Sequence, residues 1–295
     1  MDKFVTDQAE GLRRLLGRGG PHVIAVAGGS DGLGRTTTVI NLAAALTGQG
    51  KNVVVVDEWC GVLSVSEVMG GSDSLASVAR GELPVAEAVA RHAPGFGVLA
   101  APLAGQRWLA GAPLTRLLSG HADIVLVDAQ LDVDGALSPL ATQAHDLMVV
   151  MRVEPQAITD AYACVKRLHF AHAVGQLRVL INCVESQAEA KTVFDNLAGV
   201  ASRYLNVALE HAGCITADPY MPRAQGLARC IVDAFPSTAA ARDYRQLAAA
   251  LQYWPIRPAL SARGGPGGAP EPASGYAGRQ QQGDVPVQRT SAQHA

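Results

Sequence analysis

Short apolar runs alternate with stretches of helical periodicity along most of the chain. The runs are apolar at consecutive positions, which is typical of strands that helices cover on both faces. Six candidate strands have this pattern: 23–27, 53–57, 97–100, 124–128, 147–152 and 178–182. Candidate helices between them include 36–46, 84–91 and 157–168. This alternation predicts an α/β fold with a doubly wound, mostly parallel sheet and helices on both faces.

Composition shifts divide the chain into three parts. Residues 1–20 form a short helix-like segment that ends in a cluster of glycines before Pro21, and the alternating core follows as residues 21–258. Residues 259–295 are rich in Gly, Pro and Gln and hold almost no large apolar side chains. Such a segment buries too little surface to offset its chain entropy, so we expect it to be a disordered tail.

Charge and composition exclude several classes of function. The 295 residues are 48% apolar, and 24 Lys and Arg against 26 Asp and Glu give a net charge of −2. A nucleic-acid partner usually demands a basic excess, so we expect none here. The charged N-terminus has no apolar signal region, the chain has no 18-residue apolar run, and its five cysteines are scattered. We therefore expect a cytoplasmic protein with reduced thiols and no membrane-spanning helix.

The most informative stretch, residues 23–37, reads as a strand, a glycine turn and the start of a helix. Backbone N–H groups and the helix dipole favour an anion at such a turn. Against the P-loop pattern G-x-x-x-x-G-K-[ST], the chain has Gly29, Gly34, Arg35 and Thr36, with arginine where lysine is expected. The Thr36 hydroxyl would bind Mg²⁺, whereas Arg35 keeps the positive charge but is not an equivalent replacement.

Two other interpretations of this turn stay open. The glycine spacing also fits short-chain dehydrogenases, and Tyr162 and Lys166 supply a Y-x-x-x-K pattern. That class needs a serine about thirteen residues before the tyrosine, by the family pattern, and position 149 is valine. A core tyrosine and a surface lysine produce the same pattern by chance. The third interpretation is a tight turn that packs helix on strand and binds no ligand.

Further segments carry a family resemblance over residues 1–252. Residues 7–13 (DQAEGLR) are similar to a D-Q-A-x-x-L-R box, and residues 154–162 (EPQAITDAY) to E-P-x-[AS]-I-T-D-A-Y. Together with the glycine turn, they resemble the MinD/ParA-type deviant P-loop ATPases, and within them the flagellar number regulators of the FlhG or FleN group. Asn182, at the end of a candidate strand, matches the adenine-reading asparagine of that family.

The resemblance implies ATP and Mg²⁺ as ligands. Their expected nucleotide-binding residues are Gly29, Gly32, Gly34, Arg35, Thr36, Thr37 and Asn182, and the expected metal-site residues are Thr36, Asp57 and Asp128. Asp57 would hold the metal's water shell, and Asp128 fits the Walker B carboxylate. The alternative for both is a solvated carboxylate at the end of a strand.

Departures from the family pattern affect the groups that perform phosphoryl transfer. The family turn K-G-G-x-G-K-T-T has lost both lysines: Ser30 replaces the first and Arg35 the second, and Asp31 adds a negative charge. Two like unit charges about 4 Å apart repel by about 4 kcal/mol at an effective dielectric of ~20. The water-orienting Asp is Trp59, and Glu58 would point to the other side of an extended chain.

We therefore expect a nucleotide-switch scaffold with damaged chemistry. ATP and Mg²⁺ would be bound weakly or no longer bound, hydrolysis would be slow or absent, and an ATP-driven homodimer would not be favoured. The alternative is an active ATP-dependent switch, of flagellar or cell-division-site type, in which Arg35 acts in place of the P-loop lysine.

The N-terminal box implies a protein partner. In the resembling family it docks on FlhF, a GTPase of the signal-recognition-particle type, and its Gln assists the attacking water. Carried over, Gln8 is the activating residue and Asp7, Leu12 and Arg13 are docking contacts. The alternative is an amphipathic helix that packs on its own domain. Flagellar basal-body proteins are further expected partners, and the expected location is the cytoplasm, extending to the inner-membrane face near the cell pole.

Residues 240–254 have near-helical apolar spacing at Tyr244, Leu247, Leu251 and Trp254. Relatives in the resembling family end in an amphipathic membrane-binding helix. The apolar side is modest here and few basic residues flank it, so we predict a helix that covers the core. Transient membrane contact is the second interpretation.

Overall fold

A computed structural model describes residues 20–59, 61–70, 74–89, 95–103 and 113–263 of the chain. The predicted partner-binding segment lies outside these residues, except for Gly20, and so does the tail from residue 264 onward. The calls on Asp7, Gln8, Leu12 and Arg13 therefore stay predictions.

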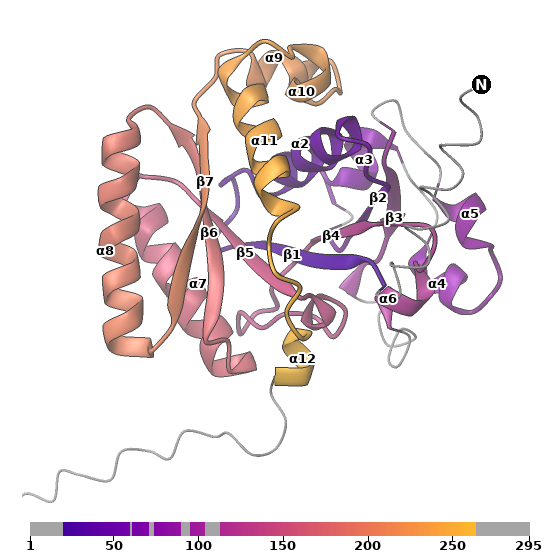
Figure 1. Cartoon of the computed structure of the whole chain (residues 1–295), viewed down its shortest axis with the longest axis horizontal. Helices are drawn as coiled ribbons and strands as arrows, with labels where there is room; N and C mark the ends of the chain where they lie inside the picture. Colours follow the sequence, from indigo (N-terminus) through magenta and orange to yellow (C-terminus); the bar gives the residue numbers. More distant parts are fainter. Residues whose placement is uncertain (1–19, 60, 71–73, 90–94, 104–112, 264–295) are drawn as a thin grey trace, which may run out of the picture. The chain divides into compact units, whose positions relative to one another are not determined.

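Seven strands form one sheet in the order β3-β2-β4-β1-β5-β6-β7, and every pair of neighbours in it is parallel (Figure 1). The strands are β1 (His22–Gly28), β2 (Val53–Asp57), β3 (Gly97–Ala100), β4 (Ile124–Asp128), β5 (Asp146–Met151), β6 (Gln176–Val184) and β7 (Ala208–Thr216). The larger helices are α2 (Arg35–Gly48), α7 (Pro155–His172), α8 (Gln187–Leu205) and α11 (Ala239–Leu251).

Shorter helices fill the connections. They are α3 (Val65–Met69), α4 (Leu75–Ala79), α5 (Val85–Ala88), α6 (Leu114–Leu117), the 3-10 turn η2 (Ala141–Gln143), α9 (Met221–Gly226), α10 (Ile231–Ala234) and α12 (Leu260–Arg263). Many begin with the side-chain caps expected from their sequence: Ser64 accepts a hydrogen bond from the Glu67 N–H and Ser74 one from the Ala76 N–H.

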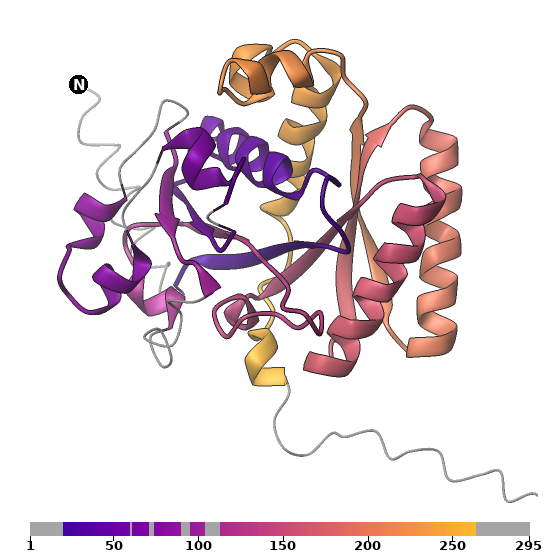
Figure 2. The ribbon, with the colours of Figure 1, turned by 180° about the vertical axis from the view of Figure 1, so that it is seen from behind.

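Two hydrophobic layers cover the sheet. Side chains of α2, α10 and α11 pack with one set of alternate strand residues, and those of α7 and α8 pack with the other set. Helices α7 and α8 lie side by side in both views of the ribbon (Figures 1 and 2). The central strands β1, β2, β4 and β5 are almost entirely buried, which explains their unbroken apolar runs.

The order of strands fixes where a ligand can bind. β1 lies between β4 and β5, and the helices that follow β1 and β5, α2 and α7, pack on opposite faces of the sheet. Chain connections that leave neighbouring strands toward opposite faces open a crevice at the carboxyl ends of those strands. The glycine turn lies at this switch point.

The structure confirms the doubly wound parallel fold and all six candidate strands, and it corrects some of the predicted elements. β7 and the long helix α8 precede the C-terminal helix and were not among the predicted elements. β7 is only partly buried and mixes polar with apolar residues, so it gives no apolar run. The predicted helix 84–91 is shorter within the described residues, where α5 spans Val85–Ala88.

The C-terminal helix covers the core, as predicted. Tyr244, Leu247 and Leu251 of α11 are buried among side chains of α2 and the sheet. Leu260 is also buried, and its N–H donates to the Ala144 carbonyl at 2.9 Å. The packed chain therefore extends beyond the predicted boundary at residue 258. Within the described residues, no helix is both long and apolar enough to span a membrane.

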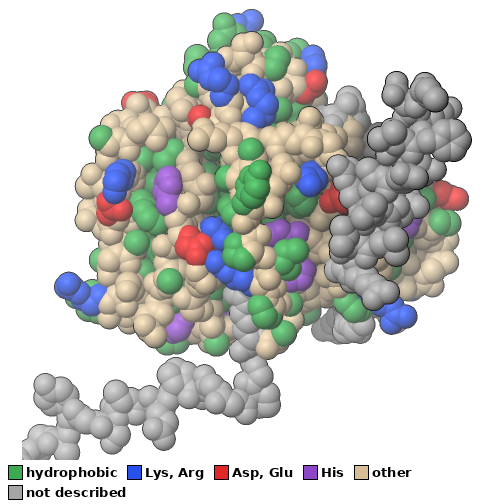
Figure 3. Space-filling view, in the orientation of Figure 1, with side chains coloured by type: hydrophobic (Ala, Val, Ile, Leu, Met, Phe, Trp, Pro, Cys, Tyr) green, Lys and Arg blue, Asp and Glu red, His purple; other side chains and the backbone are tan. Residues whose placement is uncertain are grey.

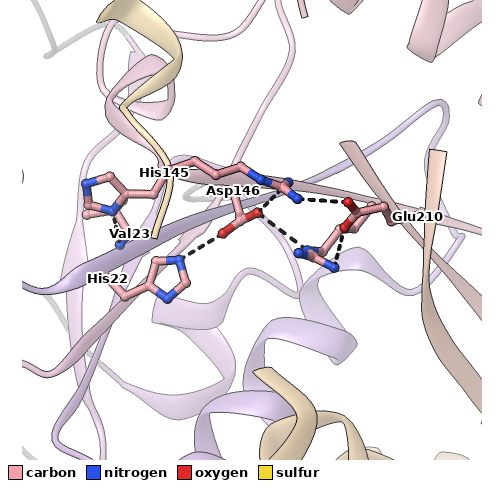
Figure 4. Close-up of polar contacts among 7 residues, drawn as sticks. His22, Val23, His145, Asp146 and Glu210 are labelled. Atoms are coloured by element: carbon pink, nitrogen blue, oxygen red, sulfur yellow. Dashed lines mark hydrogen bonds and ion pairs between the residues drawn. The ribbon is translucent and has the colours of Figure 1, made fainter. Parts of the chain in front are cut away.

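A buried ion network joins the amino ends of four strands to the segment after α11 (Figure 4). The buried Asp146 carboxylate contacts His22 at 2.9 Å, Arg257 at 3.0 Å and Arg178 at 3.4 Å. Glu210 contacts both guanidiniums, Arg178 at 2.6 Å and Arg257 at 2.8 Å. Arg257 thus holds the C-terminal segment against β5 and β7.

The charges around Asp146 set its ionisation. Burial alone would raise the pKa of this carboxyl, but the hydrogen bond and charge of His22 and the charges of Arg178 and Arg257 hold the pKa below its usual range. Trp254 adds to the clamp, because the Arg178 guanidinium lies 4.0 Å from its ring centre.

Replacing Arg257 with methionine should lower the free energy of unfolding at neutral pH by about 1–3 kcal/mol, because Asp146 and Glu210 each lose a charged hydrogen-bond donor. The native pKa of Asp146 is depressed, so this stabilisation is complete above the usual carboxyl pKa of about 3.9 and is lost as pH falls through the lower native value. Urea titrations from neutral to acidic pH measure it. The exposed Arg203→Met is the control, and equal losses in both variants would contradict the clamp.

Candidate functional site

The glycine turn connects β1 to α2 and is shaped by close packing. A Cβ at Gly29 would lie 2.4 Å from the Asp160 carbonyl oxygen of α7, and one at Gly34 would lie 2.2 Å from the Asn182 amide nitrogen. Gly34 has φ +89° and Gly32 φ +77°, the left-handed region that glycine tolerates best. The turn therefore needs glycine at these positions for its own conformation and packing, whether or not a ligand binds.

A pocket of about 500 Å³ opens over this turn. Its floor is the turn and the first residues of α2, and its walls come from the loop after β2, the end of β5 and the segment of α9 and α10. The Asn41 carbonyl oxygen on α2 accepts the Ile231 N–H at 2.8 Å, which fixes α10 above the helix. Lys and Arg side chains gather over the α9–α10 region (Figure 3).

Arg35 points to a carboxylate at the end of a neighbouring strand. Its Nε lies 2.6 Å from Oδ1 of Asp128 on β4, and the Thr36 hydroxyl donates to Oδ2 of the same carboxylate at 2.7 Å. Both carboxylate oxygens are therefore engaged by residues of the glycine turn and α2. The Arg35 side chain is 18% exposed and that of Asp128 is completely buried.

Burial raises the pKa of Asp128, which Arg35 and the Thr36 hydroxyl partly offset and the charge of Asp57 increases. The alternative of a solvated strand-end carboxylate is therefore wrong for Asp128. A buried carboxylate beside another acid needs a nearby positive charge to stay ionised, and Arg35 supplies that charge here.

Asp57 lies directly beside Asp128 in the β2–β4 register and is also buried. Its Oδ1 accepts the Trp59 N–H at 3.1 Å and its Oδ2 accepts the Ser66 N–H at 2.7 Å. Asp57 therefore shapes the loop that follows β2, and the solvated alternative is wrong here too. Glu58 turns to the other side, as predicted, where it accepts hydrogen bonds from the Gln130 N–H and the Ser138 hydroxyl.

Trp59 occupies the position of the family's water-orienting carboxylate. Its side chain is 36% exposed, lines the pocket, and donates from Nε1 to the Val62 carbonyl at 3.1 Å. Val62 and Leu63 beside it are strongly exposed and also line the pocket. An indole can stack or pack but cannot accept a proton from water, so this wall of the pocket offers contact area in place of a catalytic base.

Asn182 lies against the glycine turn. Its side-chain Nδ2 donates to the Leu33 carbonyl at 2.9 Å, and the residue is buried. Asn182 is not among the residues that line the pocket, and neither is Gly29. Thr37 does line it, and its hydroxyl accepts a hydrogen bond from Gln225 of α9 at 3.2 Å.

The structure thus brings most of the expected site residues together and adds others. Gly32, Gly34, Arg35, Thr36 and Thr37 share the pocket floor. The sequence analysis missed three polar pocket residues, namely Arg152, Gln225 and Arg229. An arginine at the carboxyl end of a strand beside the glycine turn was a usable signal for Arg152, whereas nothing local marked Gln225 and Arg229.

The Y-x-x-x-K pair of the dehydrogenase interpretation lies elsewhere. Tyr162 is partly buried against the core and Lys166 is exposed, and neither lines the pocket. This is the chance pattern of a core tyrosine and a surface lysine on α7.

Comparison with known proteins agrees with the glycine-turn geometry. Residues 24–225 match the family described as the CobQ/CobB/MinD/ParA nucleotide binding domain. The chain belongs to this family. It is similar to a protein of Pseudomonas aeruginosa named antiactivator FleN, with 29% identity over 80% of this chain and 88% of that protein. It is also similar to the flagellum site-determining protein YlxH of Helicobacter pylori, with 25% identity over 67% of this chain and 70% of that protein.

Solved structures of the CobQ/CobB/MinD/ParA family share the fold. The MinC:MinD cell division complex of Aquifex aeolicus matches with a TM-score of 0.62 and 20% identity, over 80% of this chain and 97% of that one. The septum site-determining protein MinD of Pyrococcus horikoshii, complexed with Mg-ADP, matches with a TM-score of 0.57 and 19% identity, over 79% and 96%.

Family members with Mg-ADP raise the question of whether a magnesium ion fits here. Mg²⁺ prefers oxygen ligands and holds several waters around it. The carboxylate oxygens of Asp128 and Asp57 already accept hydrogen bonds, and the cationic Arg35 touches Asp128 where a metal's water shell would need it. A guanidinium at this place repels a divalent cation, so the observed arrangement does not fit Mg²⁺.

Replacing Arg35 with methionine should lower the free energy of unfolding by about 3 kcal/mol at neutral pH, because it leaves the buried Asp128 without its cation. Loss of Arg35 raises the native pKa of Asp128 further, so the difference from the wild type should shrink as pH falls and the carboxyl becomes protonated. Chemical denaturation at several pH values measures it.

The control for this prediction is Arg80→Met, which removes an exposed partner of Glu82 and should leave the unfolding free energy nearly unchanged. A loss at Arg35 that is equally small, or that grows on acidification, would contradict the role of Arg35 as counter-charge.

Proposed function

We propose that this chain regulates the number or placement of flagella on a MinD-like scaffold. The similarity to antiactivator FleN over 80% of the chain, together with that to YlxH, supports the proposal. The N-terminal residues 7–13 point the same way, because their pattern resembles the box of flagellar number regulators.

The observation that carries the mechanistic part of the proposal is the contact between Arg35 and Asp128. Phosphoryl transfer depends on charges aimed at the phosphates and on an oriented water. Arg35 is directed at a carboxylate, Ser30 replaces the first family lysine, and Trp59 replaces the water-orienting acid. We therefore propose weak or absent ATP hydrolysis and no ATP-driven homodimer.

Under this proposal the working part is the N-terminal segment, which acts on a partner GTPase of the signal-recognition-particle type, FlhF. Gln8 would orient the attacking water in the partner's site, because its amide both donates and accepts hydrogen bonds. Asp7, Leu12 and Arg13 would dock the segment. Basal-body proteins, a cytoplasmic location near the pole and transient membrane contact complete the proposal.

The proposal predicts that the full chain accelerates GTP hydrolysis by the partner and that Gln8→Ala removes most of this acceleration. A water-positioning residue supplied in trans is worth orders of magnitude in phosphoryl transfer, so the loss should be ten-fold or more. Single-turnover GTP hydrolysis at fixed partner concentration measures it. The matched control is Gln187→Ala, at an exposed position of α8.

Undiminished stimulation by Gln8→Ala would sink the partner mechanism, and so would equal losses in both glutamine variants. The alternative, an active ATP-dependent switch in which Arg35 acts as the P-loop lysine, makes a different prediction. It requires Mg²⁺-dependent ATP turnover that Arg35→Met abolishes.

A further inference from the structure

Three arginines line the pocket over the glycine turn, and they differ in how their charge is used. Arg35 contacts Asp128 at 2.6 Å. Arg229 contacts Asp233 through both Nε, at 3.0 Å, and Nη2, at 2.6 Å. Arg152 has a weaker ionic contact, with Nη1 3.7 Å from the exposed Glu154 carboxylate.

The Nε atom of Arg152 is buried and has no hydrogen-bond partner among the described residues. An N–H donor that is removed from water without an acceptor is costly, and it is retained where a ligand supplies the acceptor. Arg152 follows directly on the last residue of β5, whose Val150 pairs with Gly28 at the start of the glycine turn. The guanidinium therefore enters the pocket beside the turn whose backbone favours anions.

We propose that Arg152 is the anion-binding cation of this pocket, and that the pocket takes a phosphate-bearing ligand without a divalent metal ion. Arg35 and Asp128 form an internal pair that leaves no place for the metal, whereas Arg152 keeps donors available for phosphate oxygens. A planar guanidinium suits this task, because it can give two parallel hydrogen bonds to one phosphate group. The inference concerns the pocket alone and holds whether or not the chain stimulates a GTPase.

Two ligand sources share this chemistry, namely a nucleoside diphosphate and an inorganic polyphosphate anion. Isothermal titration of the full-length chain with ADP and with pyrophosphate distinguishes them. Tighter binding of ADP assigns the site to a nucleotide, and equal binding assigns it to the phosphates alone. Failure of both to bind at millimolar concentration would overturn the proposal.

Each titration is run in excess EDTA and again in excess Mg²⁺. The affinity in EDTA should stay within about two-fold of that in Mg²⁺, because no protein group is left to hold the metal. An affinity that rises by about ten-fold or more with Mg²⁺ would overturn the metal-independent part of the proposal.

Arg152→Gln should weaken binding by about ten-fold or more, the effect of losing a charge-assisted hydrogen bond. Arg203→Gln, which removes the same charge from an exposed site on α8, should leave the affinity unchanged. Arg229→Gln should have a smaller effect than Arg152→Gln, because its guanidinium is held by Asp233. Equal effects of the Arg152 and Arg229 variants would show a diffuse field and overturn the assignment.

Arg152→Lys keeps the proposal testable if the glutamine variant does not fold. Lysine retains the charge but lacks the planar pair of donors, so its affinity should fall below that of the wild type. An unchanged affinity in the lysine variant would contradict a guanidinium-specific contact.

Discussion

The ion pair between Arg35 and Asp128 constrains the whole carboxyl edge of the sheet. It joins the first residue of α2 to the last residue of β4 across 93 residues of chain, and Thr36 completes the contact from the next position. Two buried acids, Asp57 and Asp128, stand side by side on neighbouring strands, and such a pair needs a cation. In this chain the cation belongs to the protein itself, so the charge that could act on a ligand is held inside the fold.

Several other features follow from this arrangement. With both oxygens of Asp57 accepting backbone N–H groups, the loop after β2 presents Trp59, Val62 and Leu63 to the pocket. The pocket has kept the glycine turn and its anion-favouring backbone but has lost the side chains that clamp and cleave a triphosphate. A scaffold of this kind can present a partner-binding segment and hold a ligand without turning it over.

The amino edge of the sheet serves stability by the same chemistry. There Asp146 and Glu210 share the guanidiniums of Arg178 and Arg257, with His22 as a further partner of Asp146. The two edges thus differ in what their ionic groups do. At the amino edge every cation named here faces an acid, whereas at the carboxyl edge Arg152 keeps a buried N–H group unsatisfied among the described residues.

The sequence predicted the central strands and the site's location because continuous apolar runs and a glycine turn are local signals. β7 escaped prediction because its residues are mixed in polarity and its burial is partial. The direction taken by Arg35 was beyond local inference, since its partner lies far along the chain and an arginine at this place could equally face a phosphate. The same holds for Asn182, whose match to an adenine-reading residue says nothing of the Leu33 carbonyl that it binds here.

The most direct test of the central claim is a crystal structure of the full chain grown with ATP and Mn²⁺, with anomalous data collected for manganese. The account predicts Arg35 Nε still on the Asp128 carboxylate and no manganese peak beside the Thr36 hydroxyl. A manganese ion bound by Thr36, with Arg35 swung onto the terminal phosphate, would contradict it.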